Sequence, residues 1–195
     1  MPYSKEHKES TRQKILDSAV TLFASQGFDQ VSIDDLMNHA GLTRGAFYAH
    51  FKDKKTLYSK AMVAAARKSR IVKAEKPADM TEEEWVVELL LGYLSEDHIN
   101  QIISPCPLAF LVTDIANREK EVQATYTKMY KLINKTIQAQ LKGNDTVKEE
   151  DVLATTAMMI GSVAIGRALN DDEMTRKLLG SARKASLDLL GLHKN

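Results

Sequence analysis

Two helix starts with one glycine between them lie within residues 32–51, SIDDLMNHAGLTRGAFYAHF. Ser32 and Asp35 have the spacing of a capping box, in which each side chain accepts a hydrogen bond from the backbone N–H of the other residue. Gly41 can adopt the left-handed conformation that commonly ends a helix, and Thr43 has the side chain of a second N-cap. The stretch therefore predicts a helix-turn-helix.

The second helix of a DNA-binding helix-turn-helix enters the major groove, with its first residues at the base edges. The first residues of the second predicted helix are Thr43, Arg44 and Gly45. We expect Arg44 to be the main base-contacting residue, because a bidentate arginine contact to guanine is worth roughly 1–3 kcal/mol of discrimination. Gly45 costs about 1 kcal/mol relative to alanine in a helix; close approach to the groove would explain it, and helix flexibility without a role is the alternative.

A pattern of residues keeps its register across three predicted helices between about 8 and 60. Its members are Thr11-Arg12, Ile15-Leu16, Leu22-Phe23, Gly27-Phe28, Ser32-Ile33, Ala40-Gly41, Thr43-x-Gly45-x-Phe47-Tyr48-x-His50-Phe51 and Lys54-x-x-Leu57. The pattern resembles the N-terminal domain of TetR/AcrR-type transcriptional regulators. This resemblance implies an all-helical homodimer that binds a pseudo-palindromic double-stranded DNA operator and releases it when a small-molecule effector enters the C-terminal domain.

The resemblance also implies phosphate contacts beside the base contacts. Tyr48 and His50 match DNA-contacting positions of the family, and Lys54 matches its phosphate-contacting lysine; packing against the neighbouring phenylalanines is the alternative for Tyr48 and His50. Ser32 would present a hydroxyl and free helix amides to the DNA backbone. Lys54 and Lys55 lie in the first turn of the next helix, where the helix dipole disfavours cations, so a bound phosphate would stabilise them.

The charge is distributed unevenly along the chain. Residues 1–76 hold 14 Lys and Arg against 8 Asp and Glu, a net charge of +6, and the remainder holds 13 against 18, or −5. A basic N-terminal part followed by an acidic C-terminal part is typical of a chain whose N-terminal domain binds nucleic acid. The alternative is a lysine-rich face that is simply solvated. We find neither an apolar run of membrane-spanning length nor a secretory leader, so we expect no membrane partner and a cytoplasmic location.

Apolar residues recur at helical spacing almost throughout, so we expect an all-α protein of about nine helices. A helix over 54–75 would link a helix-turn-helix DNA-binding domain at 1–53 to a helical effector-binding and dimerisation domain at 54–195. The other helices are predicted to follow caps at Ser10 and Thr81 and to cover 107–116, 119–141, 152–169 and 172–190.

The last two predicted helices indicate a subunit interface. Helix 152–169 is apolar almost all round, so it must be covered on more than one side. Helix 172–190 carries an apolar face made of Met174, Leu178, Ala182, Ala185 and Leu189. Two such helices from each chain would form a four-helix homodimer interface. The alternative is that 152–169 is buried wholly within its own domain.

Large apolar side chains of the C-terminal domain could line a cavity for a flat or hydrophobic effector. They are Trp85, Tyr93, Phe110, Tyr126, Met129 and Tyr130. The alternative is that aromatic and methionine residues at helical spacing are ordinary core.

Cys106 is the only cysteine and precedes Pro107, which suits the first position of a helix. A thiol at such an N-cap has its anion stabilised and becomes more reactive. Its placement also resembles TetR-type regulators that sense electrophiles or oxidants. We therefore hypothesise that Cys106 is a redox or electrophile sensor, with a small buried apolar residue as the alternative.

Enzymatic chemistry finds no support in the sequence. The histidines at 7, 39, 50, 98 and 193 have no metal-ligand spacing, no serine or cysteine has an evident base partner, and no phosphate-binding loop occurs. We expect no cofactor and no metal. The predicted function is a ligand-responsive homodimeric repressor; a helical carrier or enzyme and a protein-interaction adaptor are the alternatives.

Overall fold

The computed structural model describes residues 5–68, 71, 75–100, 106–141 and 146–192. All regular secondary structure in these ranges is helical, which confirms the predicted all-α fold. The helices described there are α1 (Lys5–Gln30), α2 (Ile33–His39), α3 (Arg44–Tyr48), α4 (Lys54–Lys68), α6 (Glu82–Tyr93), α7 (Glu96–Ile99), α8 (Pro107–Phe110), α9 (Val112–Ala116), α10 (Lys120–Gln140), α11 (Glu149–Ala168) and α12 (Asp172–Leu189). None of the described helices is long and apolar enough to span a lipid bilayer.

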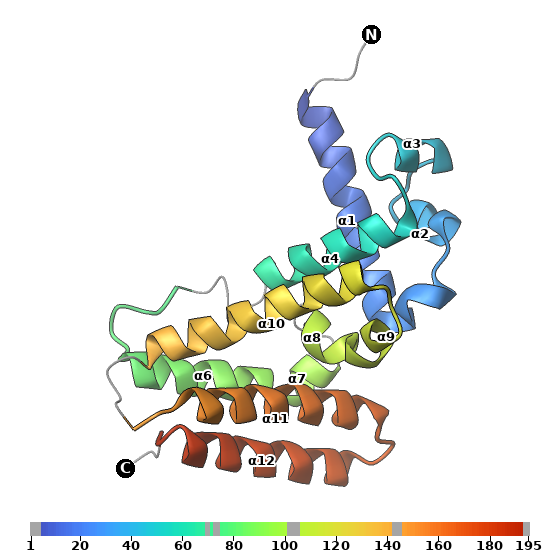
Figure 1. Ribbon diagram of the computed structural model, residues 1–195. Helices are drawn as coiled ribbons and strands as arrows, with labels where there is room; N and C mark the ends of the chain where they lie inside the picture. The colour runs from blue at the N-terminus through green and yellow to red at the C-terminus, as the bar shows by residue number, and fades with distance from the viewer. Residues whose placement is uncertain (1–4, 69–70, 72–74, 101–105, 142–145, 193–195) are drawn as a thin grey trace.

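The first three helices form the head, which lies at the opposite end of the molecule from α11 and α12 (Figure 1). Its core is closed by residues that flank the two predicted caps. Val31 lies just before the cap of α2 and is fully buried together with Leu36. Phe47 of α3 is also fully buried. Packing of these side chains in one cluster fixes how α2 and α3 lie against α1.

α1 starts earlier than predicted and bends where a stop was expected. It is helical from Lys5 rather than from a cap at Ser10, because the lysine and glutamate residues between them are good helix formers. At Gly27 the backbone has φ 77° and ψ 175°, and this kink separates the long part of α1 from its last turn, which ends at Gln30. The kink turns the end of α1 toward α9, since a Cβ added at Gly27 would lie 4.0 Å from Asp114.

α4 leads from the head into the body, which is our name for α6–α12. It packs against α1 on one side and α10 on the other. The predicted link over 54–75 is helical from Lys54 to Lys68 and at Ile71, whereas Glu75 is not helical. Residues 69–70 and 72–74 of that prediction lie outside the described residues.

The body is a stack of helices around α10. The buried face of α10 is formed by Val122, Met129, Ile133 and Ile137, which recur at helical spacing. The predicted helix 107–116 is divided into α8 and α9, because Leu111 between them has φ −117° and ψ 5°. α11 and α12 lie side by side along the edge of the body (Figure 1), with α11 next to α10 and α12 next to α6.

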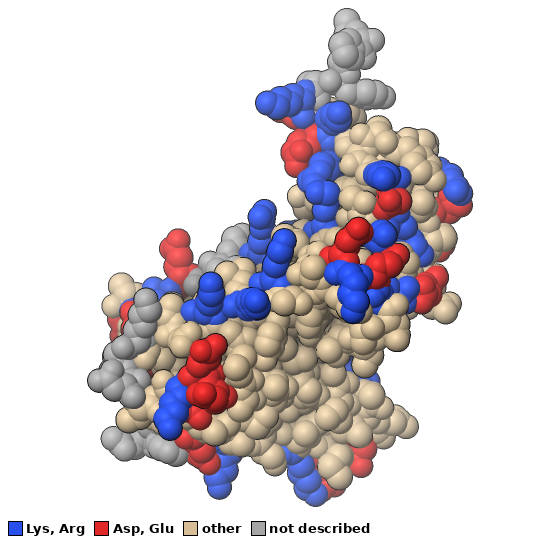
Figure 2. Space-filling model, in the orientation of Figure 1, with Lys and Arg blue, Asp and Glu red and all other residues tan. Residues whose placement is uncertain are grey.

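An apolar outer face remains on α11 and α12. Within the subunit α12 buries Thr175, Leu179, Ala182 and Ser186. Of the predicted stripe only Ala182 is buried, and Met174 is 50% exposed. The other large apolar side chains exposed on these two helices are Leu153, Ile165 and Leu189. Figure 2 shows a broad uncharged surface over this part of the body.

Candidate nucleic-acid interface

The predicted capping box at the start of α2 is confirmed. The backbone N–H of Asp35 donates to Ser32 Oγ at 3.0 Å, and the backbone N–H of Ser32 donates to Asp35 Oδ2 at 2.9 Å. The hydroxyl of Ser32 also donates to this carboxylate at 2.6 Å. Hydrogen bonds from the Ser32 side chain and backbone lower the pKa of Asp35. Ser32 is exposed, so the N-terminus of α2 faces solvent with its cap in place.

The corner between α2 and α3 depends on Gly41. Its φ of 67° is a left-handed conformation that only glycine adopts without strain. The N–H of Leu42 then reaches back to the carbonyl of Met37 at 2.9 Å, which is the long-range bond of a Schellman motif. This ending turns the chain sharply and places Thr43 at the start of α3.

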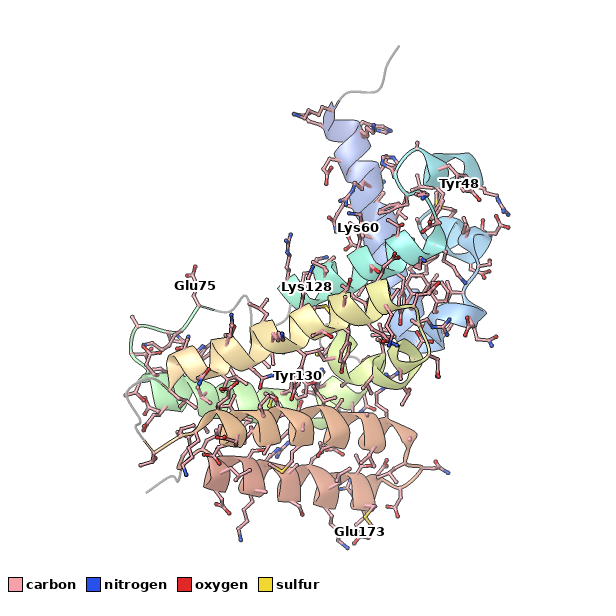
Figure 3. All side chains as sticks on the ribbon, viewed as in Figure 1. Tyr48, Lys60, Glu75, Lys128, Tyr130 and Glu173 are labelled. Atoms are coloured by element: carbon pink, nitrogen blue, oxygen red, sulfur yellow. The ribbon has the colours of Figure 1, made fainter. Side chains whose placement is uncertain are left out.

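α3 presents one polar face to solvent and buries the opposite one. Thr43 occupies the N-cap position, but its side chain makes no capping hydrogen bond. Arg44 has a 59% exposed side chain, and a Cβ on Gly45 would meet nothing within 4 Å. Tyr48 is 57% exposed on the outside of the head (Figure 3). Thr43, Arg44 and Gly45, predicted to meet bases, and Tyr48, predicted to meet a phosphate, are therefore all exposed.

Arg44 has an acidic neighbour that sequence reasoning missed. Its Nη1 donates to Oδ2 of Asp34, on α2, at 2.6 Å. The Tyr48 hydroxyl and then the Asp34 carboxylate raise the pKa of Arg44. The contact crosses the corner of the helix-turn-helix, so the spacing of ten residues between Asp34 and Arg44 gave no helical signal for it.

His50 and Lys54 are less open than predicted. His50 is half-buried, and its Nδ1 is buried without a hydrogen-bond partner among the described residues. Burial, followed by the charges of Lys8 and Arg12, lowers the pKa of His50. Lys54 turns inward: its Nζ donates to the carbonyls of Phe28 and Val31, each at 2.9 Å.

The inward position of Lys54 corrects the expected helix-end anion site. Its Nζ lies 4.1 Å from the centre of the Phe28 ring, and burial lowers its pKa. Two carbonyl oxygens thus take the place that a phosphate was expected to fill. Lys55 pairs with Glu119 and Glu121 at 3.4 and 3.5 Å, whereas Lys52, just before α4, is exposed.

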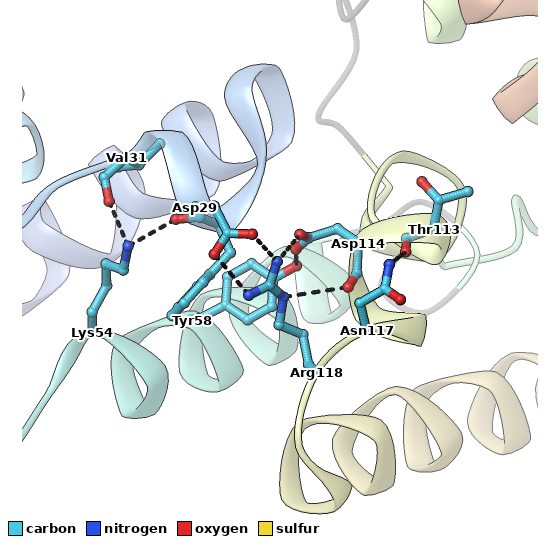
Figure 4. A network of polar contacts seen from close by, with 9 residues as sticks. Asp29, Val31, Lys54, Tyr58, Thr113, Asp114, Asn117 and Arg118 are labelled. Carbon is cyan, nitrogen blue, oxygen red and sulfur yellow. Dashed lines mark hydrogen bonds and ion pairs between the residues drawn. The ribbon is translucent and has the colours of Figure 1, made fainter.

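A polar contact joins the head to the body (Figure 4). Arg118 Nη1 donates to Asp29 Oδ1 at 2.8 Å, and Nη2 donates to the other oxygen of Asp29 and to Asp114 Oδ1, the latter at 2.8 Å. Tyr58 of α4 donates its hydroxyl to Asp114 Oδ2. Arg118 also covers the Phe28 ring at 4.8 Å. The end of α1, α4 and α9 are thereby connected through one guanidinium whose side chain is 15% exposed.

Several predicted ligand-binding residues lie together in the core of the body. The Tyr93 hydroxyl donates to Cys106 Sγ at 3.5 Å, and the Tyr126 hydroxyl donates to the carbonyl of Leu108 at 2.9 Å. The side chain of Tyr130 extends from α10 to α11 (Figure 3), and its hydroxyl lies 3.1 Å from Thr156 Oγ1. Trp85 and Met129 are buried in the same hydrophobic cluster.

Phe110 has a different set of neighbours. Its ring stacks on His98 with 5.7 Å between ring centres. The guanidinium of Arg167, on α11, lies 3.7 Å from the centre of the Phe110 ring. Arg167 Nη2 also donates to the carbonyl of Ala24 at 3.2 Å. Phe110 therefore lies near the junction of α11 with α1.

Cys106 is the N-cap of α8 with Pro107 at the next position, as predicted. The expected lowering of its pKa is wrong. Burial raises the pKa of Cys106 against the opposing hydrogen bonds from Tyr93 and from the backbone N–H groups of Leu108 and Ala109. Desolvation of a thiolate in an apolar core thus exceeds the stabilisation that the start of a four-residue helix supplies. Among the described residues, no group of three or more His, Cys, Asp or Glu could hold a metal ion.

Comparisons with known proteins find a family match for the helix-turn-helix and its neighbouring helices. The model of the bacterial regulatory proteins of the tetR family matches residues 15–61, from α1 into α4. The HTH-type transcriptional regulator AcrR of Shigella flexneri is 48% identical over 56 residues, which are 29% of this chain and 26% of the relative. Residues 15–61 thus match the N-terminal model of the tetR family. The match to AcrR spans about a quarter of the length of that relative.

Weaker similarity extends over the whole chain, body included. The uncharacterized HTH-type transcriptional regulator YfiR of Bacillus subtilis is 25% identical over 195 residues, covering 95% of this chain and 93% of the relative. The crystal structure of a TetR transcriptional regulator from Chloroflexus aurantiacus superimposes with a TM-score of 0.77 at 19% identity, covering 95% of each chain. The structural likeness shows that the fold is shared from head to body.

Proposed function

We propose that this chain is a homodimeric transcriptional regulator that binds a pseudo-palindromic operator and is released from it by a small-molecule effector. The observation that carries the proposal is the open face of α3. Arg44 and Tyr48 are more than half exposed while Phe47 is fully buried. A helix held in this way can enter a major groove without any change in the packing of the head. Repression fits a protein that leaves DNA when its effector binds.

The proposed DNA contacts divide into two kinds. Thr43, Arg44 and Gly45 meet base edges, and Arg44 discriminates guanine through a bidentate contact. The second kind of contact is made to phosphates, by Ser32, Tyr48, His50 and Lys52. Lys52 takes the role expected of Lys54, because the Lys54 ammonium is bound to carbonyl oxygens. Phosphate contacts set the position and the salt dependence, and base contacts set the sequence.

Dimerisation is proposed through α11 and α12. Their outer face leaves Ile165 and Met174 at least half exposed, and small residues beside them would allow close approach of a second subunit. Four helices packed about a twofold axis would bury this surface. The same arrangement sets the spacing of the two heads, which must match successive major grooves roughly 34–36 Å apart.

An effector is proposed to bind in the body. The supporting group consists of Trp85, Tyr93, Cys106, Phe110, Tyr126, Met129 and Tyr130. The hydroxyl of Tyr126 lies beside an acceptor of α8, and the hydroxyl of Tyr130 lies beside an acceptor of α11. A ligand inserted there would therefore move these helices. α9 follows α8 directly and carries Asp114, which Arg118 connects to the head. Movement of α8 and α9 is thus a physical route from the effector to the spacing of the heads.

The test is selection of bound fragments from random duplex DNA with the purified protein, followed by titration of the selected duplex at increasing salt. We expect an inverted repeat with half-sites about one helical turn apart. The association constant should fall by roughly 10³-fold or more between 50 and 200 mM salt if six or more phosphates are contacted. Failure to enrich any motif, together with no binding at low salt, would contradict the proposal and favour a carrier or an adaptor.

A further inference from the structure

We propose that Asp34 is a positioning residue that holds Arg44 for guanine recognition and so helps to determine which operator is bound. This inference rests on the proposed function. Asp34 is the second residue of α2 and Arg44 the first of α3. Their side chains meet over the corner that Gly41 forms, with 2.6 Å between Oδ2 and Nη1.

The geometry leaves the arginine able to bind a base. Asp34 accepts from Nη1, and a guanidinium carries five N–H donors in a planar fork. Donors therefore remain for guanine O6 and N7, which need two. Tyr48, one turn along α3, is a second neighbour that raises the pKa of Arg44. An exposed arginine without such neighbours would sample many rotamers and lose that freedom on binding.

Stability does not explain the pair. Both side chains are more than half exposed, Arg44 at 59% and Asp34 at 54%, and ion pairs of this kind contribute little to folding. A simple charge effect would have the opposite sign, since a carboxylate near DNA repels phosphates. Removal of Asp34 would then tighten binding to every duplex equally. A positioning role instead predicts that removal of Asp34 reduces discrimination between sequences.

The experiment compares wild type with Asp34→Asn, Asp34→Glu, Arg44→Ala and the double variant. Each is titrated with the selected duplex, with the same duplex carrying adenine in place of each half-site guanine in turn, and with an unrelated duplex. We expect Arg44→Ala to lower discrimination at one guanine by about 5- to 100-fold. Asp34→Asn should lower the discrimination at the same guanine by about 5-fold. The double variant should lose no more discrimination than Arg44→Ala alone.

Two further variants separate positioning from charge. Asp34→Glu keeps a carboxylate within reach and should restore most of the discrimination. Asp17→Asn removes an equal charge from an exposed pair between α1 and the C-terminal end of α4, where Asp17 contacts Lys68, and its discrimination should equal that of wild type.

Equal tightening on all duplexes by Asp34→Asn, or strictly additive effects of the two substitutions, would overturn the positioning role while leaving DNA binding intact. If wild type itself binds no duplex, the proposed function and this inference fall together.

Discussion

Arg118 Nη1 and Asp29 Oδ1 lie 2.8 Å apart although the two residues are separated by 89 positions in the chain. Asp29 belongs to the last turn of the kinked helix α1, and Arg118 lies between α9 and α10. The same guanidinium reaches Asp114, whose second oxygen accepts from Tyr58. The Arg118 guanidinium, bound to the carboxylates of Asp29 and Asp114, therefore helps to hold the orientation of the head on the body, and the Tyr58 hydroxyl holds Asp114 in place.

Arg118→Ala should lower the free energy of unfolding by about 2 kcal/mol, because hydrogen bonds to charged groups are lost and Asp114 is left largely buried. Chemical denaturation followed by circular dichroism measures this loss. Arg176→Ala is the matched control, since Arg176 pairs with Glu96 at 3.5 Å on the surface and such pairs contribute little. Equal midpoints for the two variants would contradict a structural role for the Arg118 contact.

Two glycine substitutions should act in opposite ways. Gly41→Ala should destabilise the protein by about 1 kcal/mol or more, since its φ of 67° is strained for alanine. Gly45→Ala should leave stability unchanged or raise it by up to about 1 kcal/mol, because its Cβ would enter open space. Gly45→Ala should nevertheless weaken binding to the selected duplex. Unchanged DNA affinity would indicate that the backbone at Gly45 does not approach the groove closely.

Stability should fall as the pH is lowered below 6.5, the ordinary pKa of histidine. Burial first, and the charge of Arg167 next, lower the pKa of His98 in the folded state. His98 therefore binds a proton more readily in the unfolded chain than in the folded one. The stabilisation from neutral, buried His98 is complete above pH 6.5 and is lost as the pH falls through the folded pKa. Urea midpoints at neutral and mildly acidic pH measure the effect.

Substitution of the two shifted histidines identifies the source of this pH dependence. His98→Gln and His50→Gln should each flatten the dependence, since burial lowers both pKa values. His98→Gln also retains a donor for the Tyr93 carbonyl, which the ring Nδ1 meets at 2.6 Å. If the double variant keeps the full slope, the source lies in other groups.

Ile165→Glu should convert the proposed dimer to a monomer and abolish tight operator binding. Ile165 is 52% exposed on the outer face of α11, and a carboxylate buried there without a partner would be costly. Sedimentation velocity gives the oligomeric state. Leu132→Glu is the control, because Leu132 is a 45% exposed apolar residue on α10, away from that face. A monomeric wild type, or dissociation by Leu132→Glu alone, would contradict the assigned interface.

Features decided by local chemistry could be predicted from the sequence. The capping box of Ser32, the left-handed Gly41 and the second capping box at Thr81 all depend on residues within one or two turns. The apolar stripe of α10 follows from its spacing for the same reason. Arg44 was expected to face DNA from its place at the start of the second helix, and its side chain is 59% exposed.

Contacts between distant segments could not be predicted. Lys54 looked like a free phosphate ligand, but the carbonyls that bind it come from Phe28, in the last turn of α1, and from Val31, in the link between α1 and α2. Cys106 had the local signals of an activated thiol, and burial by the body reversed the direction of its pKa shift. Asp34 and Arg118 each depend on a partner that only the folded chain brings near. Local patterns carry no information about such partners.

Lys54 also has a mechanical consequence. Its ammonium joins the first turn of α4 to the carbonyl of Phe28, in the last turn of α1, and to the carbonyl of Val31, in the link between α1 and α2. α4 therefore cannot swing independently of that link unless both hydrogen bonds break. We therefore expect a small tilt of α4 to rotate α2 and α3 with it, and the displacement to increase with distance from Lys54 toward Arg44.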